Sequence, residues 1–191
     1  MNVERQRTIR KAKLSELTAI MQVIEAARGI MRASGNMRQW NHGYPSEDVI
    51  TADIEKDGGY VIVENSAVVG YFAFLPSPEP SYEKIFDGQW LDDKSPYHVI
   101  HRVASYPGSR HIFRDIMAFC LSRDGNIRIS TFQENTIMQR LMEKHGFSYC
   151  GMIHVSTGHD ALAYQHSCDK HTDVYADLQN KILEYRQAIG E

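Results

Sequence analysis

Apolar residues recur along this chain with two different periods, and the two periods alternate. Short stretches with apolar residues at every second position, or apolar almost throughout, are typical of β-strands. Longer stretches with apolar residues three and four positions apart are typical of helices that pack on one face. Strands are expected at 8–12, 59–64, 67–75, 98–105, 126–131, 149–155 and 161–165, and helices at 15–31, 46–54, 112–120 and 135–145. This alternation predicts an α/β domain.

The stretch from residue 98 to residue 147 has the order strand, loop, helix, strand, helix. A polar loop, 106–110, leads from the first strand into a helix whose apolar residues are Ile112, Phe113, Ile116, Met117, Phe119 and Cys120. The loop and the start of that helix offer free backbone amides at the positive end of the helix dipole. This unit therefore has a suitable place for a phosphate group.

The segment that closes this unit carries a family resemblance. Asn135-x-x-Met138-x-x-Leu141-Met142-x-Lys144-x-Gly146-Phe147 resembles the N-x-x-A/M-x-x-L-Y-x-K-x-G-F segment of the GNAT family of N-acetyltransferases, and the resemblance extends over residues 7–166. It implies a mixed, strongly twisted sheet with helices on both faces and with the fourth and fifth strands splayed apart. It also implies an enzyme that transfers acetyl from acetyl-CoA directly to a primary amine of a small molecule or a peptide.

Two departures from the family pattern bear on activity. The family's pyrophosphate loop reads Q/R-x-x-G-x-G/A, and the corresponding positions here are Gly108, His111 and Phe113. The bulky side chains at 111 and 113 are expected to restrict positive φ angles and the close approach of phosphates. The family tyrosine that protonates the departing thiolate corresponds to Met142, which cannot donate a proton. Two hypotheses stay open: an N-acetyltransferase with an altered loop, or a degenerate member that binds a ligand or partner without catalysing transfer.

The residues that would hold acetyl-CoA follow from the resemblance. The unpaired edge of strand 98–105 would align the pantetheine arm, and the backbone amides of 109–113 would hold the pyrophosphate. Asn135 would lie near the pantetheine, although it can equally be the N-cap of its helix. The cofactor-binding residues expected on this basis are Val103, Ala104, Ser105, Ser109, Arg110, His111, Ile112, Phe113, Asn135 and Met138.

A general base is expected on strand 98–105, because family members often carry an acidic group there. Strict alternation along this strand would turn Val99, His101, Val103 and Ser105 toward the cleft. His101 is the candidate base, since the pKa of an imidazole lies near neutral pH. The alternative is a histidine that only satisfies a local hydrogen bond.

Candidates for the acid that protonates the thiolate are weaker. Ser105 is our candidate, and Tyr106 and Tyr149 are conceivable, but none of them corresponds to the family position. A thiol with a pKa of about 8.5 leaves adequately without help at neutral pH. A missing acid would therefore slow the reaction more than it would forbid it.

Large aromatic residues in the loops are candidates for binding the acceptor. Trp40 and Tyr44 lie after the first helix, a region that many family members use for this purpose, and Tyr82 and Trp90 form a second pair. The alternative is that these rings only close the core beneath long loops.

Composition adds limits on the setting. The chain has 191 residues and a net charge of −3, which does not suggest a nucleic-acid or anionic-membrane surface. No apolar run approaches the length that spans a membrane. Three cysteines without C-x-x-C spacing favour a reducing, cytoplasmic setting. The His166, Cys168 and His171 group is a poor match to a metal site, so no metal is expected.

The C-terminal residues extend past the family segment. We expect one domain at 1–166 and a helical extension at 167–191. Its apolar residues fall largely on one stripe: Val174, Leu178, Ile182, Leu183 and Ile189. That stripe should pack on its own domain or on a second subunit, so the protein is expected to be a monomer or a homodimer.

Overall fold

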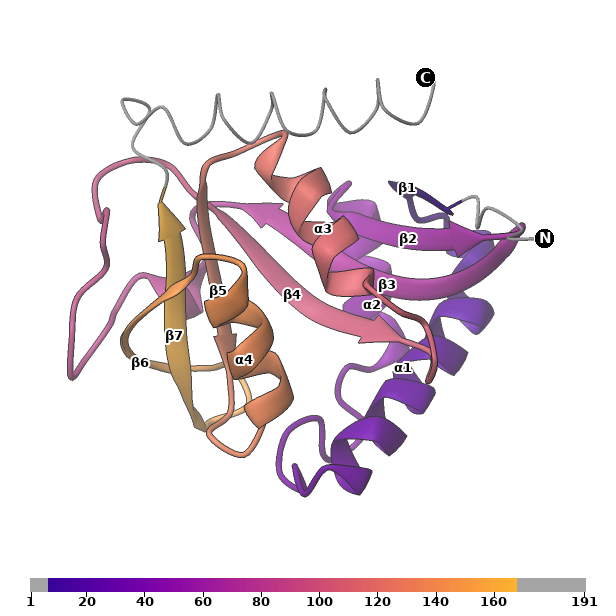
Figure 1. Ribbon diagram of the computed structural model, residues 1–191, viewed down its shortest axis with the longest axis horizontal. Coiled ribbons are helices and arrows are strands. Elements are labelled where there is room, and N and C mark those ends of the chain that lie inside the picture. The colour runs from indigo at the N-terminus through magenta and orange to yellow at the C-terminus, as the bar shows by residue number, and fades with distance from the viewer. Residues whose placement is uncertain (1–6, 168–191) are drawn as a thin grey trace.

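The computed structural model describes residues 7–167, whose strands form one mixed sheet. The strands are β1 (Arg7–Lys11), β2 (Gly59–Glu64), β3 (Ala67–Pro76), β4 (His98–Ser105), β5 (Asn126–Thr131), β6 (Ser148–His154) and β7 (Asp160–Ser167). Their order across the sheet is β1-β2-β3-β4-β5-β7-β6 (Figure 1). Neighbouring strands in this order are antiparallel except for β4 and β5, which are parallel. No helix of the described part is long and apolar enough to cross a membrane.

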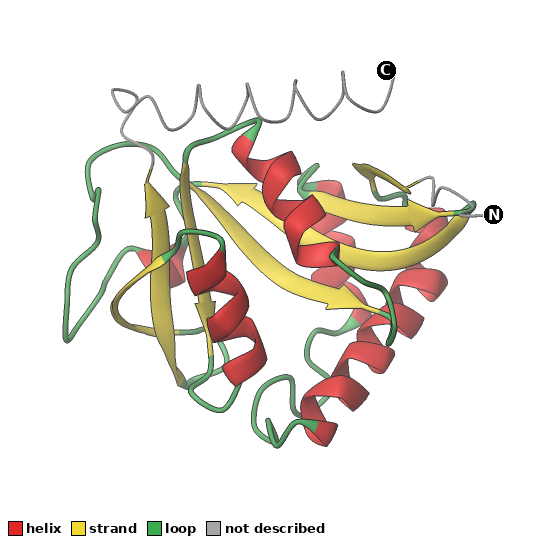
Figure 2. Cartoon of the chain, in the orientation of Figure 1, coloured by secondary structure: helices red, strands yellow, loops and turns green. Residues whose placement is uncertain are grey.

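Helices cover both faces of the sheet, as expected. The helices are α1 (Leu17–Ala33), α2 (Glu47–Glu55), α3 (Ile112–Leu121) and α4 (Thr136–Lys144). Helices α3 and α4 lie in front of the sheet in Figure 2, and α1 and α2 lie behind it. The α/β prediction and the mixed, twisted sheet are therefore confirmed. The predicted C-terminal helix lies outside the described residues.

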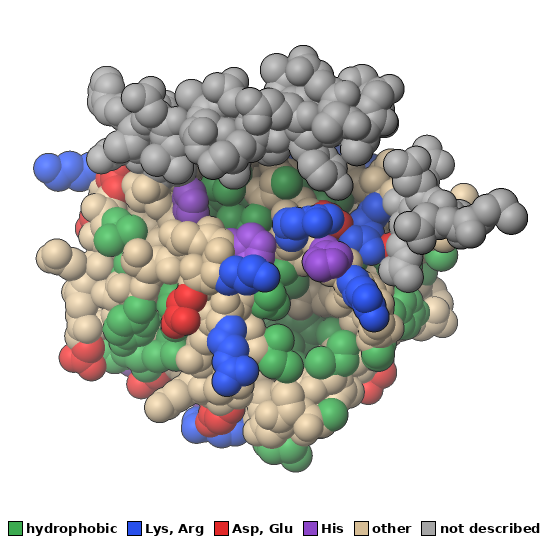
Figure 3. All heavy atoms as spheres, in the orientation of Figure 1, with side chains coloured by type: hydrophobic (Ala, Val, Ile, Leu, Met, Phe, Trp, Pro, Cys, Tyr) green, Lys and Arg blue, Asp and Glu red, His purple; other side chains and the backbone are tan. Residues whose placement is uncertain are grey.

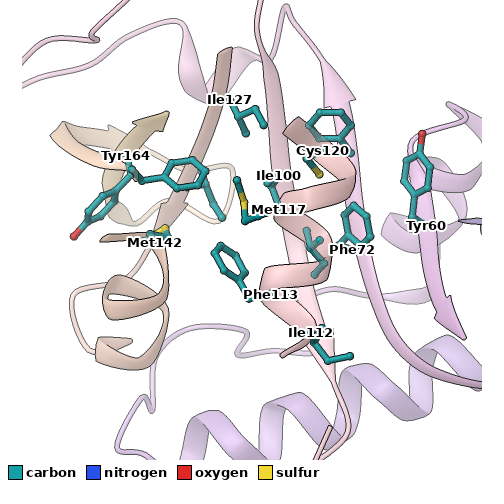
Figure 4. Packing of buried hydrophobic residues seen from close by; sticks show 14 of the residues in the cluster. Tyr60, Phe72, Ile100, Ile112, Phe113, Met117, Cys120, Ile127, Met142 and Tyr164 are labelled. Atoms are coloured by element: carbon teal, nitrogen blue, oxygen red, sulfur yellow. The ribbon is translucent and has the colours of Figure 1, made fainter. Parts of the chain in front are cut away.

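The core on the α3 and α4 face is built from the apolar positions that the helical period predicts. Ile116 and Cys120 on α3 are fully buried, and Phe113 is 4% exposed. Figure 4 shows Phe113 extending from α3 toward Met142 on α4, with Met117 beside it. This packing fixes the N-terminal end of α3 over the sheet.

Helix boundaries follow local signals in two cases and depart from them in a third. Ser46 caps α2, because its hydroxyl accepts a hydrogen bond from the Val49 amide at 3.4 Å. Gly146 follows α4 with a φ of 83°, a left-handed angle that glycine adopts without strain. The first helix was expected to begin at residue 15, as an N-cap serine there suggests, and that prediction is wrong: Ser15 lies inside a 3₁₀ turn, η1 (Leu14–Glu16), that precedes α1.

A long excursion between β3 and β4 is held in place by one buried arginine. The Arg128 guanidinium on β5 donates to the Tyr82 carbonyl at 3.0 Å and to the Asp92 carbonyl at 2.9 Å. It also lies over the rings of Trp90 and Tyr97, at 4.1 and 3.8 Å from their centroids. These contacts set the 3₁₀ turn η2 (Pro80–Tyr82) against the sheet.

Strands β4 and β5 part soon after they begin. They pair only at His98 with Ile127 and at Val99 with Arg128. From Ile100 onward, that edge of β4 has no strand partner among the described residues. The splay that the family resemblance implies is therefore present.

Candidate functional site

A cavity of about 260 Å³ occupies the space where β4 and β5 diverge. Its walls come from α1, the loop after α1, η2, β4, β5, α4, the loop between β6 and β7, and β7. Figure 3 shows the surface hollowed here between α4 and α1, with apolar side chains lining the hollow. The cavity collects these residues that the sequence singles out: Trp40, Tyr44, Tyr82, His101, Val103, Ala104, Ser105, Asn135 and Met138.

A β-bulge in β4 changes which side chains face which way. Ala73 on β3 pairs with His101, whereas Tyr71 pairs with Ala104, so β4 holds one extra residue over this interval. Arg102 lies at the bulge with a φ of 55°. Strict alternation therefore fails, and the expectation that residues 99, 101, 103 and 105 share one face is wrong.

The side-chain contacts of β4 show which residues lie on each face of the strand. Val99 belongs to the cluster that contains Tyr82, and the His101 ring meets the Tyr82 ring edge-on at 5.5 Å. Val103 packs instead against the core beneath α3 and α4, and Ala104 packs with the α1 cluster. With the bulge, the successive residues 100–105 of β4 all line the same cavity.

A buried charged pair holds the bulge in position. The Arg102 guanidinium donates to the Asp53 carboxylate of α2, with an Nε–Oδ2 distance of 2.6 Å and a second bond from Nη2 to Oδ1. The Arg102 and Asp53 side chains are 10% and 4% exposed. The Tyr71 hydroxyl also donates to Asp53 at 3.0 Å, and Arg102 Nη1 donates to the Tyr44 hydroxyl at 3.2 Å. Burial opposes the charge of Arg102, but the hydrogen bonds and charge of Asp53 raise its pKa.

This pair was not predicted from the sequence, although the residue pattern contains a signal for it. Asp53 occupies a position on α2 three residues after the fully buried Ile50, and Arg102 lies inside an otherwise apolar strand. Charged residues at apolar positions of two elements indicate a buried pair. The pattern alone does not say which acid meets which base.

His101 lines the cavity, as predicted, but its surroundings disfavour the protonated form. Burial, and next the positive charge of Arg102, lower the pKa of its imidazole well below the ordinary value. His101 is therefore neutral at pH 7 and a weak proton acceptor. This weakens its assignment as the general base.

Glu79, at the start of η2, is an acidic group of the cavity that the sequence analysis did not single out. Its Oε2 atom is buried and has no hydrogen-bond partner among the described residues. Burial raises the pKa of this carboxyl, while the Ser81 amide and the charges of Arg102 and Lys56 lower it by less. No spacing rule indicates Glu79, because packing of the excursion brings it to the cavity.

The loop between β4 and α3 adopts the backbone that a phosphate site needs, despite its side chains. Gly108 and His111 have φ angles of 83° and 63°, both left-handed. Arg7 on β1 steadies the loop by donating to the Arg110 carbonyl at 2.9 Å and to Asp115 at 2.5 Å. The first amides of α3 have no partners within the helix, and they lie at its positive end.

Two expectations about this loop need correction. The Phe113 ring does not crowd the loop, because it is buried in the core, where it meets His145 edge-on at 5.2 Å. The Ser109 amide is not free for a phosphate, since it donates to the Tyr106 carbonyl at 3.2 Å. The residues 109–113 lie outside the cavity wall, in the loop and helix start that follow Ser105.

Asn135 is the N-cap of α4, so that alternative is confirmed. Its Oδ1 accepts from the Met138 amide at 3.1 Å, and its Nδ2 donates to Gln39 Oε1 at 2.9 Å. Arg38 and Glu134 form an ion pair beside it at 3.3 Å. These contacts join the loop after α1 to the start of α4 across one end of the cavity.

No model of a known protein family matches the chain, and no curated protein does. Solved structures match it well. An acetyltransferase of the GNAT family from Streptococcus agalactiae is 31% identical, with a TM-score of 0.74, over 88% of this chain and all of that one. This chain belongs to the GNAT family. Two further structures share the fold: a GNAT acetyltransferase from Listeria monocytogenes, at 14% identity and a TM-score of 0.64 over 85% of this chain and 95% of that one, and the Salmonella typhimurium protein yncA.

The yncA structure is that of a candidate acetyltransferase with its cofactor acetyl-CoA. It is 19% identical to this chain with a TM-score of 0.58, and the match covers 87% of this chain and 96% of yncA. These likenesses support acetyl transfer as the general activity of the fold.

In this GNAT chain the family tyrosine position contributes to packing. Met142 is fully buried in the core beneath α3 and α4. Of the three conceivable acids, Ser105 lines the cavity, whereas Tyr149 is 52% exposed and packs against Tyr164. Tyr106 packs with the α1 cluster. Within residues 7–167, no group of three or more His, Cys, Asp or Glu side chains could hold a metal ion.

The aromatic candidates for the acceptor divide into two groups. Trp40 and Tyr82 are buried at 9% and 1% exposure and also line the cavity, so they serve as both core and wall. Trp90 lies behind Tyr82, stacked at a centroid distance of 6.0 Å, and does not reach the cavity wall. The core alternative is therefore confirmed for Trp90.

Proposed function

We propose that this protein is an N-acetyltransferase that moves acetyl from acetyl-CoA to a primary amine of a small molecule or a peptide. The observation that carries the proposal is the cavity at the splay, because it joins three features. These are the unpaired edge of β4, a wall of aromatic side chains, and the amides at the start of α3, which lie outside the cavity wall after the loop that follows Ser105. Direct transfer needs such a site to hold both substrates together.

The residues present fit acetyl-CoA. The free amides of residues 112–114 and the left-handed backbone at 108 and 111 suit the pyrophosphate. The unpaired edge from Ile100 to Ser105 suits the amides of the pantetheine arm. When bound, acetyl-CoA supplies an acetyl group activated as a thioester.

The surroundings of the cleft also suit an anionic cofactor. Figure 3 shows Lys, Arg and His side chains gathered around the facing ends of α3 and α4, beside the hollow. Arg110, His111 and Arg114 are exposed at the start of α3. Such a patch attracts phosphate groups through simple charge.

A GNAT-fold protein that binds a ligand without catalysing transfer is the alternative. Met142 favours it, because no hydroxyl occupies the family position near the leaving thiolate. Thiolates leave readily, since a thiol has a pKa of about 8.5, so this substitution lowers the rate rather than abolishing transfer. Catalysis therefore remains the favoured function.

The proposal predicts that acetyl-CoA binds in this cleft. Acetyl-CoA at a concentration of about 100 times its Kd should raise the melting temperature by the equivalent of about 2.7 kcal/mol. The half-buried Met138 lines the cavity on α4. Met138→Trp should fill the pantetheine path and abolish the shift.

The matched control is Leu91→Trp, because Leu91 is 56% exposed and lies outside the cavity wall. This variant should keep the full acetyl-CoA shift. An equal shift in the Met138→Trp protein would place the cofactor elsewhere, and no shift in the wild type would reject the proposal.

A further inference from the structure

The buried oxygen of Glu79 is the strongest unused polar group of the cavity. Oε2 lies out of contact with solvent and has no hydrogen-bond partner among the described residues. A buried carboxylate oxygen without a partner is unfavourable unless a ligand satisfies it. Glu79 also lines the cavity in which an acceptor must meet the thioester.

The backbone around Glu79 is restricted, so the point from which its side chain extends toward the cavity is fixed. Pro78 and Pro80 flank it, and each proline limits the conformations of its own residue and of the residue before it. Glu79 takes the extended conformation that such a position favours, with φ −125° and ψ 114°. Beyond it, η2 is anchored by the bond from Arg128 to the Tyr82 carbonyl.

Among the described residues, Glu79 is also the one acidic residue of the cavity wall, and no nearby charge is paired with its carboxylate. Within residues 7–167, the one Lys or Arg residue of that wall is Arg102, whose charge is neutralised by Asp53. His101 stays neutral because burial and Arg102 lower its pKa. The charge of Lys56 lowers the pKa of the Glu79 carboxyl, and the charge of Glu83 raises it. The Tyr82 side chain in η2 is close enough to feel the charge of Glu79.

We propose that Glu79 binds the ammonium group of the acceptor and removes its proton, so that the cavity selects amines without a carboxylate beside the nitrogen. This inference rests on the proposed acetyl transfer. It names the class of acceptor: alkyl or arylalkyl amines, or a peptide amino terminus, rather than free amino acids. Trp40, Tyr44 and Tyr82 provide the faces against which the carbon skeleton and the cation pack.

The proton balance of the reaction follows from this role. An N–H bond of the ammonium breaks and an O–H bond forms on Glu79, which leaves a neutral amine. The amine nitrogen then forms a bond to the carbonyl carbon of the thioester while the bond from that carbon to sulfur breaks. The second proton of the amine goes to the departing sulfur, and the proton on Glu79 returns to water.

The exclusion of amino acids has an electrostatic cause. A carboxylate beside the amine would lie next to Glu79, where two negative charges repel in a partly buried site. Arg102 cannot compensate for it, since two of its nitrogens already bind the Asp53 carboxylate and a third donates to Tyr44. The other cavity-lining residues of the described part of the chain carry no full positive charge at pH 7.

The first test compares three acceptors on the wild-type protein in a thiol-release assay with acetyl-CoA. These are 2-phenylethylamine, phenylalanine and phenylalanine amide, which share one skeleton and differ beside the nitrogen. We expect phenylethylamine and the amide to react, and phenylalanine to have a kcat/KM lower by about 100-fold or more. Equal rates for the acid and the amide would overturn the inference, and so would an amide as poor as the acid.

The second test changes Glu79. Glu79→Gln keeps the shape and removes the charge, and kcat/KM for phenylethylamine should fall by about 100-fold or more. The acetyl-CoA-induced rise in melting temperature should not change. Glu79→Asp should retain part of the activity, and Glu83→Gln, at an exposed position just after η2, should match the wild type. Wild-type kcat/KM in Glu79→Gln would overturn the inference.

The pH profile separates Glu79 from His101. Burial raises the pKa of the Glu79 carboxyl, so kcat/KM should rise with pH as this group loses its proton and then level off. In Glu79→Gln, which lacks the carboxylate, kcat/KM should keep rising with pH until the pH reaches the pKa of the free amine, about 10. His101→Gln should keep the wild-type profile. If His101→Gln loses the wild-type pH profile of kcat/KM and Glu79→Gln keeps it, the assignment of Glu79 as the base is overturned.

These outcomes are distinct from a failure of acetyl transfer itself. If the wild-type protein and Glu79→Gln release thiol with phenylethylamine at the same rate, this inference is rejected and the proposed function stays intact. If the wild-type protein binds acetyl-CoA but none of the amines tested leads to thiol release, both this inference and the proposed acetyl transfer are rejected.

Discussion

Single residues in left-handed conformations shape this site. His111 and Arg102 have φ angles of 63° and 55°, which side chains other than glycine adopt at a cost. Position 111 is one that a glycine would suit, as the family motif indicates, but the motif does not show that a histidine accepts the strain there. The expectation for Phe113 was wrong, because its side chain lies on the core face of α3 and not in the loop.

Substitutions at positions 113 and 111 should have opposite effects on the free energy of unfolding. Phe113→Ala should lower the free energy of unfolding by about 3–5 kcal/mol, since it leaves a hole in the core. His111→Gly should change it little or raise it by up to about 1 kcal/mol, since glycine relieves the left-handed strain. Denaturant unfolding with fluorescence detection measures both. If Phe113→Ala instead keeps full stability and tightens acetyl-CoA binding, the ring obstructs the loop after all.

Among the elements, β4 departs most from the sequence pattern. Its bounds are those predicted, 98–105, and α3, β5 and α4 also lie where their apolar periods place them. The bulge could not be read from these periods, because it depends on a partner in another element: Asp53 of α2 binds Arg102. The faces of β4, and therefore the surroundings of His101, were not predictable from alternation alone.

The Asp53–Arg102 pair should position β4 as well as stabilise it. Asp53→Ala leaves the buried Arg102 guanidinium without its counter-charge and should lower the free energy of unfolding by about 3–5 kcal/mol. The double variant Asp53→Leu with Arg102→Met should recover most of that stability, because two apolar side chains replace a matched pair.

Acetyl transfer should nevertheless stay low in the double variant, since the bulge has lost the contact that holds it to α2. Thermal melts and thiol release on the same preparations separate the two effects. A stable double variant with wild-type turnover would show that the pair has no positioning role.

At the scale of the whole molecule, the cleft results from how the sheet divides. Strands β4 and β5 pair at only two positions, and the space between them holds the cavity, whose β4 wall ends at Ser105, just before the loop to α3. The resemblance implied this splay, and the structure confirms it. Glu79 lay beyond sequence reasoning, because the packing of Arg128 against the excursion brings it to the cleft.

Some predictions concern the protein beyond this domain. Cys120 and Cys150 are free thiols, both buried. The cytoplasmic setting stays a prediction, as does the choice between monomer and homodimer. The C-terminal stripe on which that choice depends lies outside residues 7–167.

The most direct test of acetyl transfer is product detection by mass spectrometry. The full chain would be incubated with acetyl-CoA carrying an isotope-labelled acetyl group and with 2-phenylethylamine, while free CoA thiol is measured in parallel. The account predicts labelled N-acetyl product and free thiol in equal amounts, both absent with Met138→Trp. Bound acetyl-CoA with no labelled product from any amine tested would contradict it.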